Sequence, residues 1–179
     1  MKILTIGASY NGKVNLSKEV FDYLGSGKNN KKKYTNIVLF ASVQFVKHLP
    51  TVKAQLNEKG YNVITTKASR THVEGQILGC DVYEGNISLN KELNKKINKH
   101  NGDTGTDIDC FLYIGDGLFH PKALLFAQKE RSKEEFKEVL MYDPIGDTFR
   151  IFNYKDNEKV MKRLKGNLMK LLASENLGF

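Results

Sequence analysis

Residues 110–120 read CFLYIGDGLFH, an apolar strand that runs into Gly115-Asp116-Gly117 and then into a helix with His120 in its first turn. In an open α/β sheet, ligands are held at the carboxyl ends of the strands. The two glycines let the backbone approach a ligand, and Asp116 could hold a hydroxyl, an amine or a water. The stretch predicts a parallel sheet with a binding site at its carboxyl edge, although a helix-capping Asp116 and a structural His120 fit the same residues equally well.

Strand and helix patterns alternate on both sides of this stretch. The continuous apolar run 37–41 is typical of a central parallel strand, and 43–57 has a helical stripe that Pro50 interrupts. Further strands are predicted at 3–7, 61–65, 139–142 and 148–152, and further helices at 16–24, 88–100 and 157–173, the last with Asp156 as its cap. The order predicts an α/β fold with a mostly parallel sheet, helices on both faces and an antiparallel hairpin at the edge.

Length and composition are those of an ordinary soluble protein. The chain has 179 residues, 40% hydrophobic and 27% charged, and we expect one α/β domain over 1–155 followed by a C-terminal helix over 156–179. It has no apolar run of membrane-spanning length and no signal-peptide pattern, so we expect a cytoplasmic protein. Much of the net charge of +8 lies in the loop 28–33 and the last helix, without interleaved aromatic residues. We therefore do not expect direct nucleic-acid binding.

The two cysteines occupy different settings. Cys80 follows two glycines in an irregular stretch, 66–85, where a thiolate has the freedom to reach a metal. Cys110 lies in a strand that we expect to be buried, and a small core side chain is the favoured interpretation. A metal site needs three or four ligands, so the residues alone leave Cys80 equally as an inert thiol or a ligand.

The helix after the run 37–41 opens with polar side chains at a second strand end. Gln44 could hydrogen-bond a polar ligand there, whereas a plain N-cap is the favoured role for Ser42. The remaining histidines show no ligand spacing among themselves. The sequence has no nucleophile elbow and no carboxylate pair spaced for acid–base catalysis.

Four blocks of the sequence, taken together, resemble the diphthamide synthase family in order and spacing. They are SVQF at 42–45, GQILGC at 75–80, YIGDGLFH at 113–120 and YDP at 142–144. The resemblance covers the chain from about Ile3 to the C-terminus and is to the middle one of three similar α/β domains. It implies the first step of diphthamide synthesis, in which a 3-amino-3-carboxypropyl group passes from S-adenosylmethionine to a histidine of translation elongation factor 2.

The same resemblance implies cofactors and site residues. Family members hold a [4Fe–4S] cluster with one cysteine from each domain, and its electron makes an aminocarboxypropyl radical from S-adenosylmethionine. Cys80 matches the cluster ligand of the middle domain. The candidate residues for binding S-adenosylmethionine are Gln44, Gly115, Asp116, Gly117 and His120.

This sequence departs from the family pattern because the cysteines of the first and third domains have no counterpart. We therefore expect the chain to lack a cluster and activity by itself, either as a fragment of a longer protein or as a reduced member that completes a site with other chains. The expected partners are elongation factor 2 as substrate and a family member in a homo- or heterodimer. The alternatives are a non-catalytic interaction module and a small adenosyl- or nucleotide-binding α/β protein.

Overall fold

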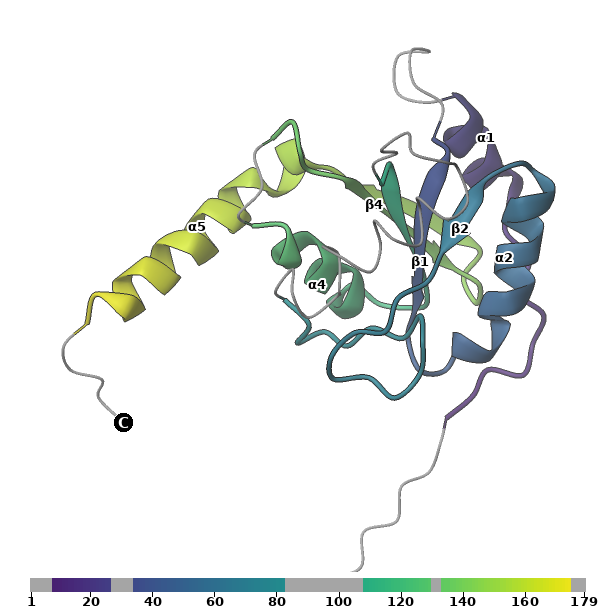
Figure 1. Ribbon diagram of the computed structural model, residues 1–179, viewed down its shortest axis with the longest axis horizontal. Helices are drawn as coiled ribbons and strands as arrows, with labels where there is room; N and C mark the ends of the chain where they lie inside the picture. Colours follow the sequence, from purple (N-terminus) through teal and green to yellow (C-terminus); the bar gives the residue numbers. More distant parts are fainter. Residues whose placement is uncertain (1–7, 27–33, 83–107, 130–132, 175–179) are drawn as a thin grey trace, which may run out of the picture.

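The computed structural model describes residues 8–26, 34–82, 108–129 and 133–174. Within them, strands form one sheet in the order β2-β1-β3-β4-β5, with helices on both faces (Figure 1). The strands are β1 (Asn36–Ala41), β2 (Asn62–Ile64), β3 (Cys110–Ile114), β4 (Glu138–Asp143) and β5 (Thr148–Phe152). The helices are α1 (Lys18–Ser26), the 3₁₀ helix η1 (Val46–His48), α2 (Leu49–Glu58), α4 (Phe119–Ala127) and α5 (Tyr154–Leu172).

The sheet is parallel except at one edge. β2, β1, β3 and β4 pair in parallel, and β5 returns antiparallel to β4. Every residue of β1 and β3 is buried, as expected for strands covered on both faces. The predicted fold, a mostly parallel sheet with an antiparallel hairpin at its edge, is confirmed.

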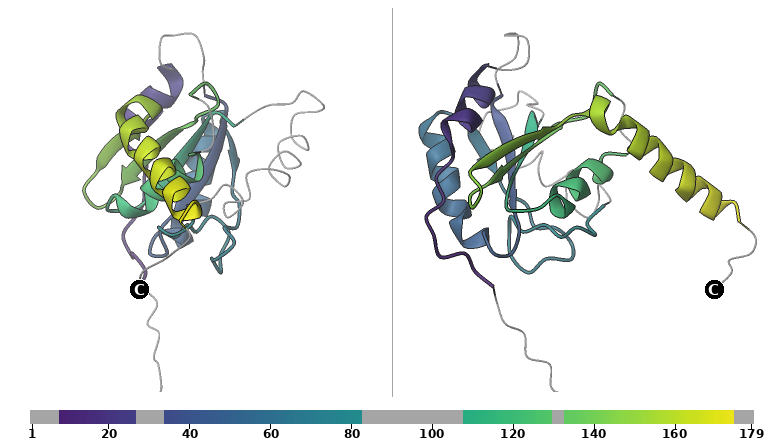
Figure 2. Two further views of the ribbon diagram at one scale, coloured as in Figure 1. Left: turned by 90° about the vertical axis from the view of Figure 1, so that its left-hand side faces the viewer. Right: turned by 180° about the vertical axis from the view of Figure 1, so that it is seen from behind.

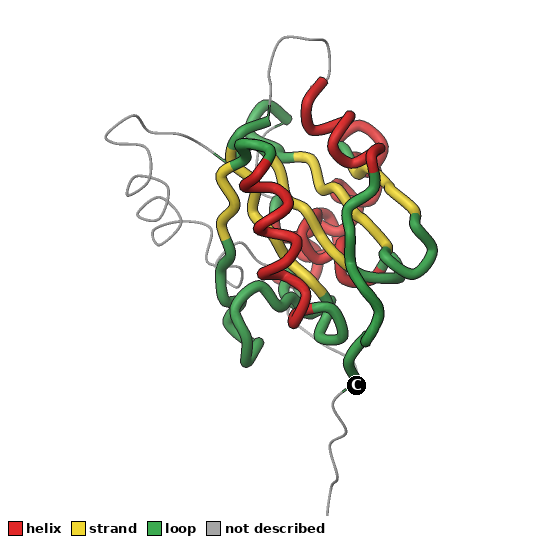
Figure 3. Tube along the Cα trace, turned by 90° about the vertical axis from the view of Figure 1, so that its right-hand side faces the viewer, coloured by secondary structure: helices red, strands yellow, loops and turns green. Residues whose placement is uncertain are grey.

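Two apolar cores lie on opposite sides of the sheet because successive strand residues point to opposite faces. Leu39 and Leu112 pack beneath α1 and α2, the helices at the front of Figure 3, and Phe40 and Phe111 pack beneath α4. Helices on both faces were predicted from the sequence, and the two cores confirm them.

Pro50 and Gly60 set the two ends of α2. Residues 43–48 form a turn and η1 instead of the predicted α-helix, and the regular helix begins at Leu49 with Pro50 in its first turn. At the other end, Gly60 has a φ of 82° and donates to the Asn57 carbonyl oxygen at 2.9 Å. Tyr61 donates to the Leu56 oxygen at 3.1 Å, which completes a Schellman motif.

α5 extends away from the body of the domain (Figure 2). It begins at Tyr154, and its cap is Asn153, whose side chain accepts from the Asp156 amide at 3.0 Å. The prediction of Asp156 as the cap was wrong because Asn153 already closes the first turn. Beyond buried Met161, α5 and α4 line a cavity of about 330 Å³ formed by Val82, Phe126, Lys129, Leu164, Asn167, Leu168 and Leu171.

Some predicted elements lie outside the described residues, namely the strand at 3–7 and the helix at 88–100. The expected domain boundary at 155 falls in the first turn of α5 and stays a prediction. In the part of the chain that the structure describes, no helix combines the length and the apolar character needed to cross a bilayer.

Candidate functional site

Three strand ends meet at one edge of the sheet, which we call the carboxyl edge. The Ser42 amide donates to the Ile114 carbonyl oxygen at 3.2 Å, which joins the end of β1 to the end of β3. The Gly115 amide donates to the Tyr142 oxygen at 3.0 Å and joins β3 to β4. The polar residues that follow these strands are thus brought to one edge of the sheet, as the sequence predicted.

Gln44 and Asp116 are in direct contact at this edge, although they are 72 residues apart in the chain. The Gln44 side-chain amide donates to Asp116 Oδ1 at 2.5 Å. The bond fixes the orientation of the carboxylate and occupies one of its two oxygens. Asp116 itself is exposed, so its other oxygen can accept from a ligand.

The Gly115-Asp116-Gly117 turn depends on both of its glycines. A Cβ at Gly115 would lie 2.5 Å from the Tyr113 hydroxyl and 3.0 Å from Ser42 Oγ. Gly117 has a φ of 68°, a left-handed conformation that side chains disfavour. The turn brings bare backbone to the surface of the site.

Two buried hydroxyls under this turn, those of Ser42 and Tyr113, lie beside each other and meet no other polar group among the described residues. Ser42 is 5% exposed and Tyr113 is 0% exposed. An N-cap is the role that the sequence favours for Ser42, but the 3₁₀ helix η1 begins after Phe45, and the Ser42 hydroxyl caps nothing. Burial raises the pKa of Tyr113, a hydrogen bond with the Ser42 hydroxyl offsets part of this rise, and Tyr113 keeps its proton.

His120 lies in the first turn of α4, as predicted, and its ring stacks on Tyr113. The ring centroids are 6.2 Å apart and the planes are inclined by 10°. Phe119 meets the same imidazole edge-on at 5.6 Å. Burial lowers the pKa of His120, and the charge of Asp116 offsets part of this effect. The imidazole is therefore neutral at pH 7.

The amino end of α4 has no side-chain cap. Its N-cap residue is Leu118, and Asp116 stays paired with Gln44, so the helix-capping interpretation of Asp116 was wrong. The first backbone N–H groups of α4 follow directly on the Gly115-Asp116-Gly117 turn. Such groups carry a partial positive charge that favours anions.

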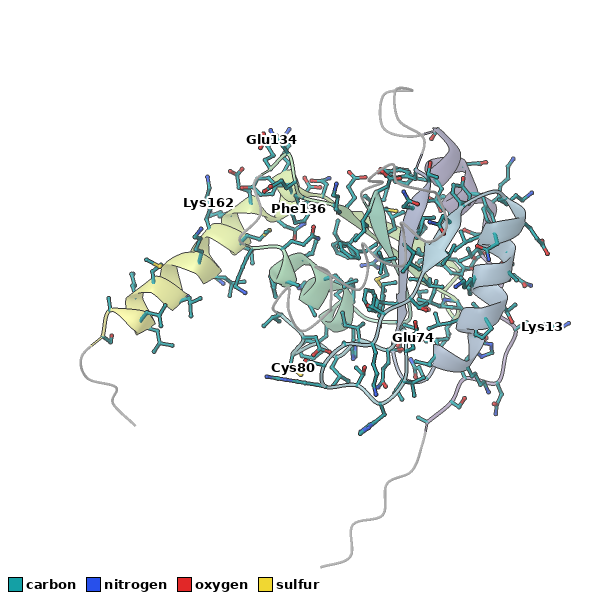
Figure 4. All side chains as sticks on the ribbon, viewed as in Figure 1. Lys13, Glu74, Cys80, Glu134, Phe136 and Lys162 are labelled. Carbon is teal, nitrogen blue, oxygen red and sulfur yellow. The ribbon has the colours of Figure 1, made fainter. Side chains whose placement is uncertain are left out.

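The loop that carries Cys80 is tied to the end of β1. Ala41 donates to the Gly75 oxygen at 2.8 Å, and Ile77 donates to the Ala41 oxygen at 3.1 Å. The turn 78–81 closes on itself, because Leu78 donates to Asp81 Oδ2 at 2.9 Å and Asp81 donates to the Leu78 oxygen at 3.0 Å. This turn holds Cys80 exposed at the surface (Figure 4).

Gly79 brings the Cys80 turn against α4. A Cβ at Gly79 would overlap the Phe119 ring, so the contact depends on a bare backbone at this position. Phe119 is the neighbour of His120, and Cys80 is the neighbour of Gly79. The turn that carries Cys80 therefore contacts α4 at Phe119.

Cys110 does not join Cys80. It is fully buried in β3, in the core beneath α1 and α2, where burial raises the pKa of its thiol. Its predicted place in the core is confirmed. Among the described residues, no group of three or more His, Cys, Asp and Glu side chains could hold a metal ion.

The model of the family described as "Putative diphthamide synthesis protein" matches residues 12–178 of this chain. The chain belongs to this family. A curated relative, the 2-(3-amino-3-carboxypropyl)histidine synthase of Pyrococcus horikoshii, is 26% identical over 149 residues. That match takes in 83% of this chain and 35% of the relative, so the chain spans about a third of the relative's length.

Two solved structures of Dph2 from Pyrococcus horikoshii are also similar to this chain. One is 26% identical with a TM-score of 0.48, and the other, described with a 4Fe-4S cluster, is 27% identical with a TM-score of 0.47. Each match covers 69% of this chain and 29% of the solved chain.

Proposed function

We propose that this chain supplies one α/β unit of an enzyme for the first step of diphthamide synthesis, with Cys80 as one ligand of a [4Fe–4S] cluster. The observation that carries the proposal is the placement of Cys80. Its thiol is exposed on a turn that Asp81 closes and that Gly79 holds against α4, beside the Asp116–His120 segment. Family membership supports the reaction class, and the cluster in the solved Dph2 supports the cofactor.

The described residues fit one corner of such a cluster. Cys80 has the exposure and soft thiolate that an iron–sulfur ligand needs, whereas buried Cys110 does not. The other cysteines would come from other domains or chains, and we propose that the chain alone is inactive for this reason. When bound, the cluster supplies the electron that breaks a carbon–sulfur bond of S-adenosylmethionine.

The residues of the carboxyl edge would bind and orient S-adenosylmethionine. Gln44 holds one oxygen of Asp116 and leaves the other for a ligand donor. Gly115 and Gly117 let the backbone approach the ligand, and neutral His120 can donate or accept a hydrogen bond. The proposed acceptor of the 3-amino-3-carboxypropyl group is a histidine of translation elongation factor 2, which implies a cytoplasmic location.

A chimera tests the proposal. The matched segment of the Pyrococcus horikoshii synthase is replaced by this chain, and the product is reconstituted anaerobically with iron and sulfide. We expect bound iron, the visible absorbance of a cluster, and transfer of labelled carbon from S-adenosylmethionine to elongation factor 2. Cys80→Ala should abolish all three, while the matched variant Cys110→Ala should retain iron. A Cys80→Ala chimera that binds as much iron as its parent would overturn the proposal.

Exposed leucines near the end of α5 favour a second candidate function, in which the chain is a module that docks on another member of the family. Leu171 and Leu172 are 53% and 73% exposed, and the cavity beside them is lined largely by apolar side chains. Binding to a full-length family member at micromolar concentration, and its loss in Leu171→Glu, would support this candidate. A catalytically active chimera with no such association would exclude it.

A further inference from the structure

We infer that Asp81 is the positioning residue of Cys80, because its side chain closes the turn 78–81 on which the exposed thiol lies. The inference deepens the proposed function and rests on it for the identity of the metal group, a [4Fe–4S] cluster. It adds a residue that does not bind iron itself. Asp81 acts through the backbone of the turn, and Cys80 is the ligand in this arrangement.

Two hydrogen bonds from Asp81 join the ends of the turn. Its Oδ2 accepts from the Leu78 amide at 2.9 Å, and its own amide donates to the Leu78 carbonyl oxygen at 3.0 Å. Gly79 and Cys80 lie between the two bonded residues. Loss of the carboxylate would leave one backbone bond across the turn, and the Cys80 backbone would then sample more conformations.

Contacts with α4 and the residues that follow it hold the chain on both sides of Cys80. On one side, Gly79 lies so close to the Phe119 ring that an added Cβ would overlap it. On the other side, Lys129 donates from its Nζ to the Val82 carbonyl oxygen at 3.0 Å. The turn is thus docked at both ends, and the side-chain bond of Asp81 fixes the part that remains between them.

Burial of the Asp81 carboxyl group costs free energy. The residue is 0% exposed, and its Oδ1 has no hydrogen-bond partner among the described residues. An apolar side chain would avoid the desolvation of this oxygen. Stability therefore does not explain an aspartate at this position, whereas the closure of the turn does.

A fixed turn matters for a cluster ligand because the thiolate must meet iron at one place. A ligand that the fold already holds in position loses less conformational entropy when the metal binds. Residues that orient a metal ligand without touching the metal change metal affinity by about 10–100-fold when they are replaced. The same range is expected for Asp81 in the complete cluster site.

The first measurement uses the chain without metal. Asp81→Ala removes the acceptor of the Leu78 amide, whereas Asp81→Asn keeps a side-chain oxygen that can accept from it. We expect hydrogen exchange of the Leu78 amide to be about tenfold faster in Asp81→Ala than in the parent chain, and near the parent value in Asp81→Asn. The urea midpoint of Asp81→Ala should stay close to that of the parent, since water can reach half-buried Leu78.

Thr71→Val is the matched control. The Thr71 hydroxyl donates to the Ala68 carbonyl oxygen at 2.8 Å and closes an earlier turn of the same loop, 68–71. The Thr71 amide donates to the same oxygen at 3.1 Å, so a side-chain bond and a backbone bond close each of the two turns. Loss of the Thr71 hydroxyl should leave the exchange of the Leu78 amide and the binding of iron unchanged.

The second measurement uses the chimera with the Pyrococcus horikoshii synthase, loaded anaerobically with iron and sulfide. We expect a chelator to remove iron about tenfold faster from Asp81→Ala than from the parent chimera, with a changed electron paramagnetic resonance spectrum of the reduced cluster. Asp81→Asn should restore both the rate and the spectrum, because it keeps the acceptor oxygen that closes the turn.

The outcomes separate the inference from the proposed function. Iron loss at the parent rate in Asp81→Ala, or a failure of Asp81→Asn to restore that rate, overturns the inference and leaves the proposed function standing. An Asp81→Ala chain that does not fold also overturns the inference, because the aspartate would then serve the fold and not the ligand. A parent chimera that binds no iron removes the proposed function and the inference together.

Discussion

The two edges of the sheet satisfy their polar groups to different extents. At the amino edge, where β1, β3 and β4 begin, Tyr23 and Tyr34 both donate to Glu138 Oε2 at 2.6 Å. Asp109 accepts there from the Thr35 and Asn36 amides at 2.8 and 3.0 Å.

Among the described residues of the carboxyl edge, the hydroxyls of Ser42 and Tyr113 are buried with no polar neighbour but each other, and one oxygen of Asp81 is buried without a hydrogen-bond partner. The polar groups of the amino edge are fully paired with one another, whereas several at the carboxyl edge are buried without such partners. Buried polar groups without a full set of partners are uncommon in native folds, so their gathering at one edge marks that edge as different from the other.

The largest loss of unfolding free energy is expected from a side chain added at Gly75, in the loop tied to the end of β1. Gly75 has a φ of 81°, and a Cβ there would overlap Leu49 Cδ1, so Gly75→Ala should cost about 3 kcal/mol of unfolding free energy. Gly60→Ala is the matched control, with a φ of 82° and open space around it, and should cost about 1 kcal/mol. Urea unfolding measures both, and equal costs would contradict the predicted clash.

Glu138→Ala should destabilise the folded chain by removing the acceptor of the polar groups at the amino edge. It leaves two tyrosine hydroxyls without their acceptor and should cost about 2–3 kcal/mol of unfolding free energy. Tyr23→Phe removes a single bond and should cost about 1 kcal/mol. An unfolding midpoint of Glu138→Ala equal to that of the parent chain would show that this edge does not depend on its polar pairs.

High pH should also lower the free energy of unfolding, through the two tyrosines of the amino edge. Burial, and then the hydrogen bond to Glu138, raise the pKa of Tyr23 and of Tyr34. Unfolded tyrosines ionise near pH 10, so the stabilisation is complete below about pH 10 and is lost as the pH rises above it. Tyrosinate absorbance measures this in a chain without tryptophan. Ionisation of these two tyrosines near pH 10 in the folded chain would contradict the prediction.

Removing a hydroxyl at the carboxyl edge should not lower the free energy of unfolding, in contrast to removing one at the amino edge. Ser42→Ala and Tyr113→Phe delete buried hydroxyls that meet no polar group but each other among the described residues, and should leave stability unchanged or raise it by up to about 1 kcal/mol. The contrast with Tyr23→Phe is the sharpest comparison of the two edges, because both tyrosine changes remove one hydroxyl. A destabilised Tyr113→Phe would mean that its hydroxyl is already satisfied in the folded chain.

The smallest change in the free energy of unfolding is expected from the protonation of His120 at acid pH. Burial lowers the pKa of its imidazole, so its contribution to stability is complete above about pH 6.5 and is lost as the pH falls below that value. Asp116→Asn should lower the pKa of His120 further, because it removes the neighbouring negative charge. NMR titration of the His120 imidazole signals in the parent chain and in the variant measures both shifts. An upward shift in the variant would contradict the assignment.

Much of the fold could be predicted from local sequence signals. The apolar runs that became β1 and β3 are buried on both faces, and alternating strands and helices left few possible topologies. Pro50 and Gly60 set the ends of α2 through backbone restrictions that hold in any protein. The convergence of Gln44 with Asp116 followed from the rule that parallel strands end at one edge.

The groups that the sequence analysis missed depend on tertiary contacts. Asn153 and Asp156 are both good caps, and only the geometry of the first turn of α5 selects Asn153. Tyr113 was predicted as part of an apolar strand, and its hydroxyl received no role. The available signal was its place beside Gly115, at the end of an otherwise apolar strand that faces α4. The hydroxyl that lies beside it belongs to Ser42, which is 71 residues away in the chain.

The exposure of α5 has a consequence for its local stability. Met161 is its one buried residue among those described, and the helix continues to Leu172. An isolated helical stretch of this length is marginal in water, because nucleation is costly and only packing offsets it. Amide hydrogen exchange should therefore be fast in the half of α5 beyond Met161 and slow in β1 and β3. Slow exchange there would report that another protein surface covers the helix.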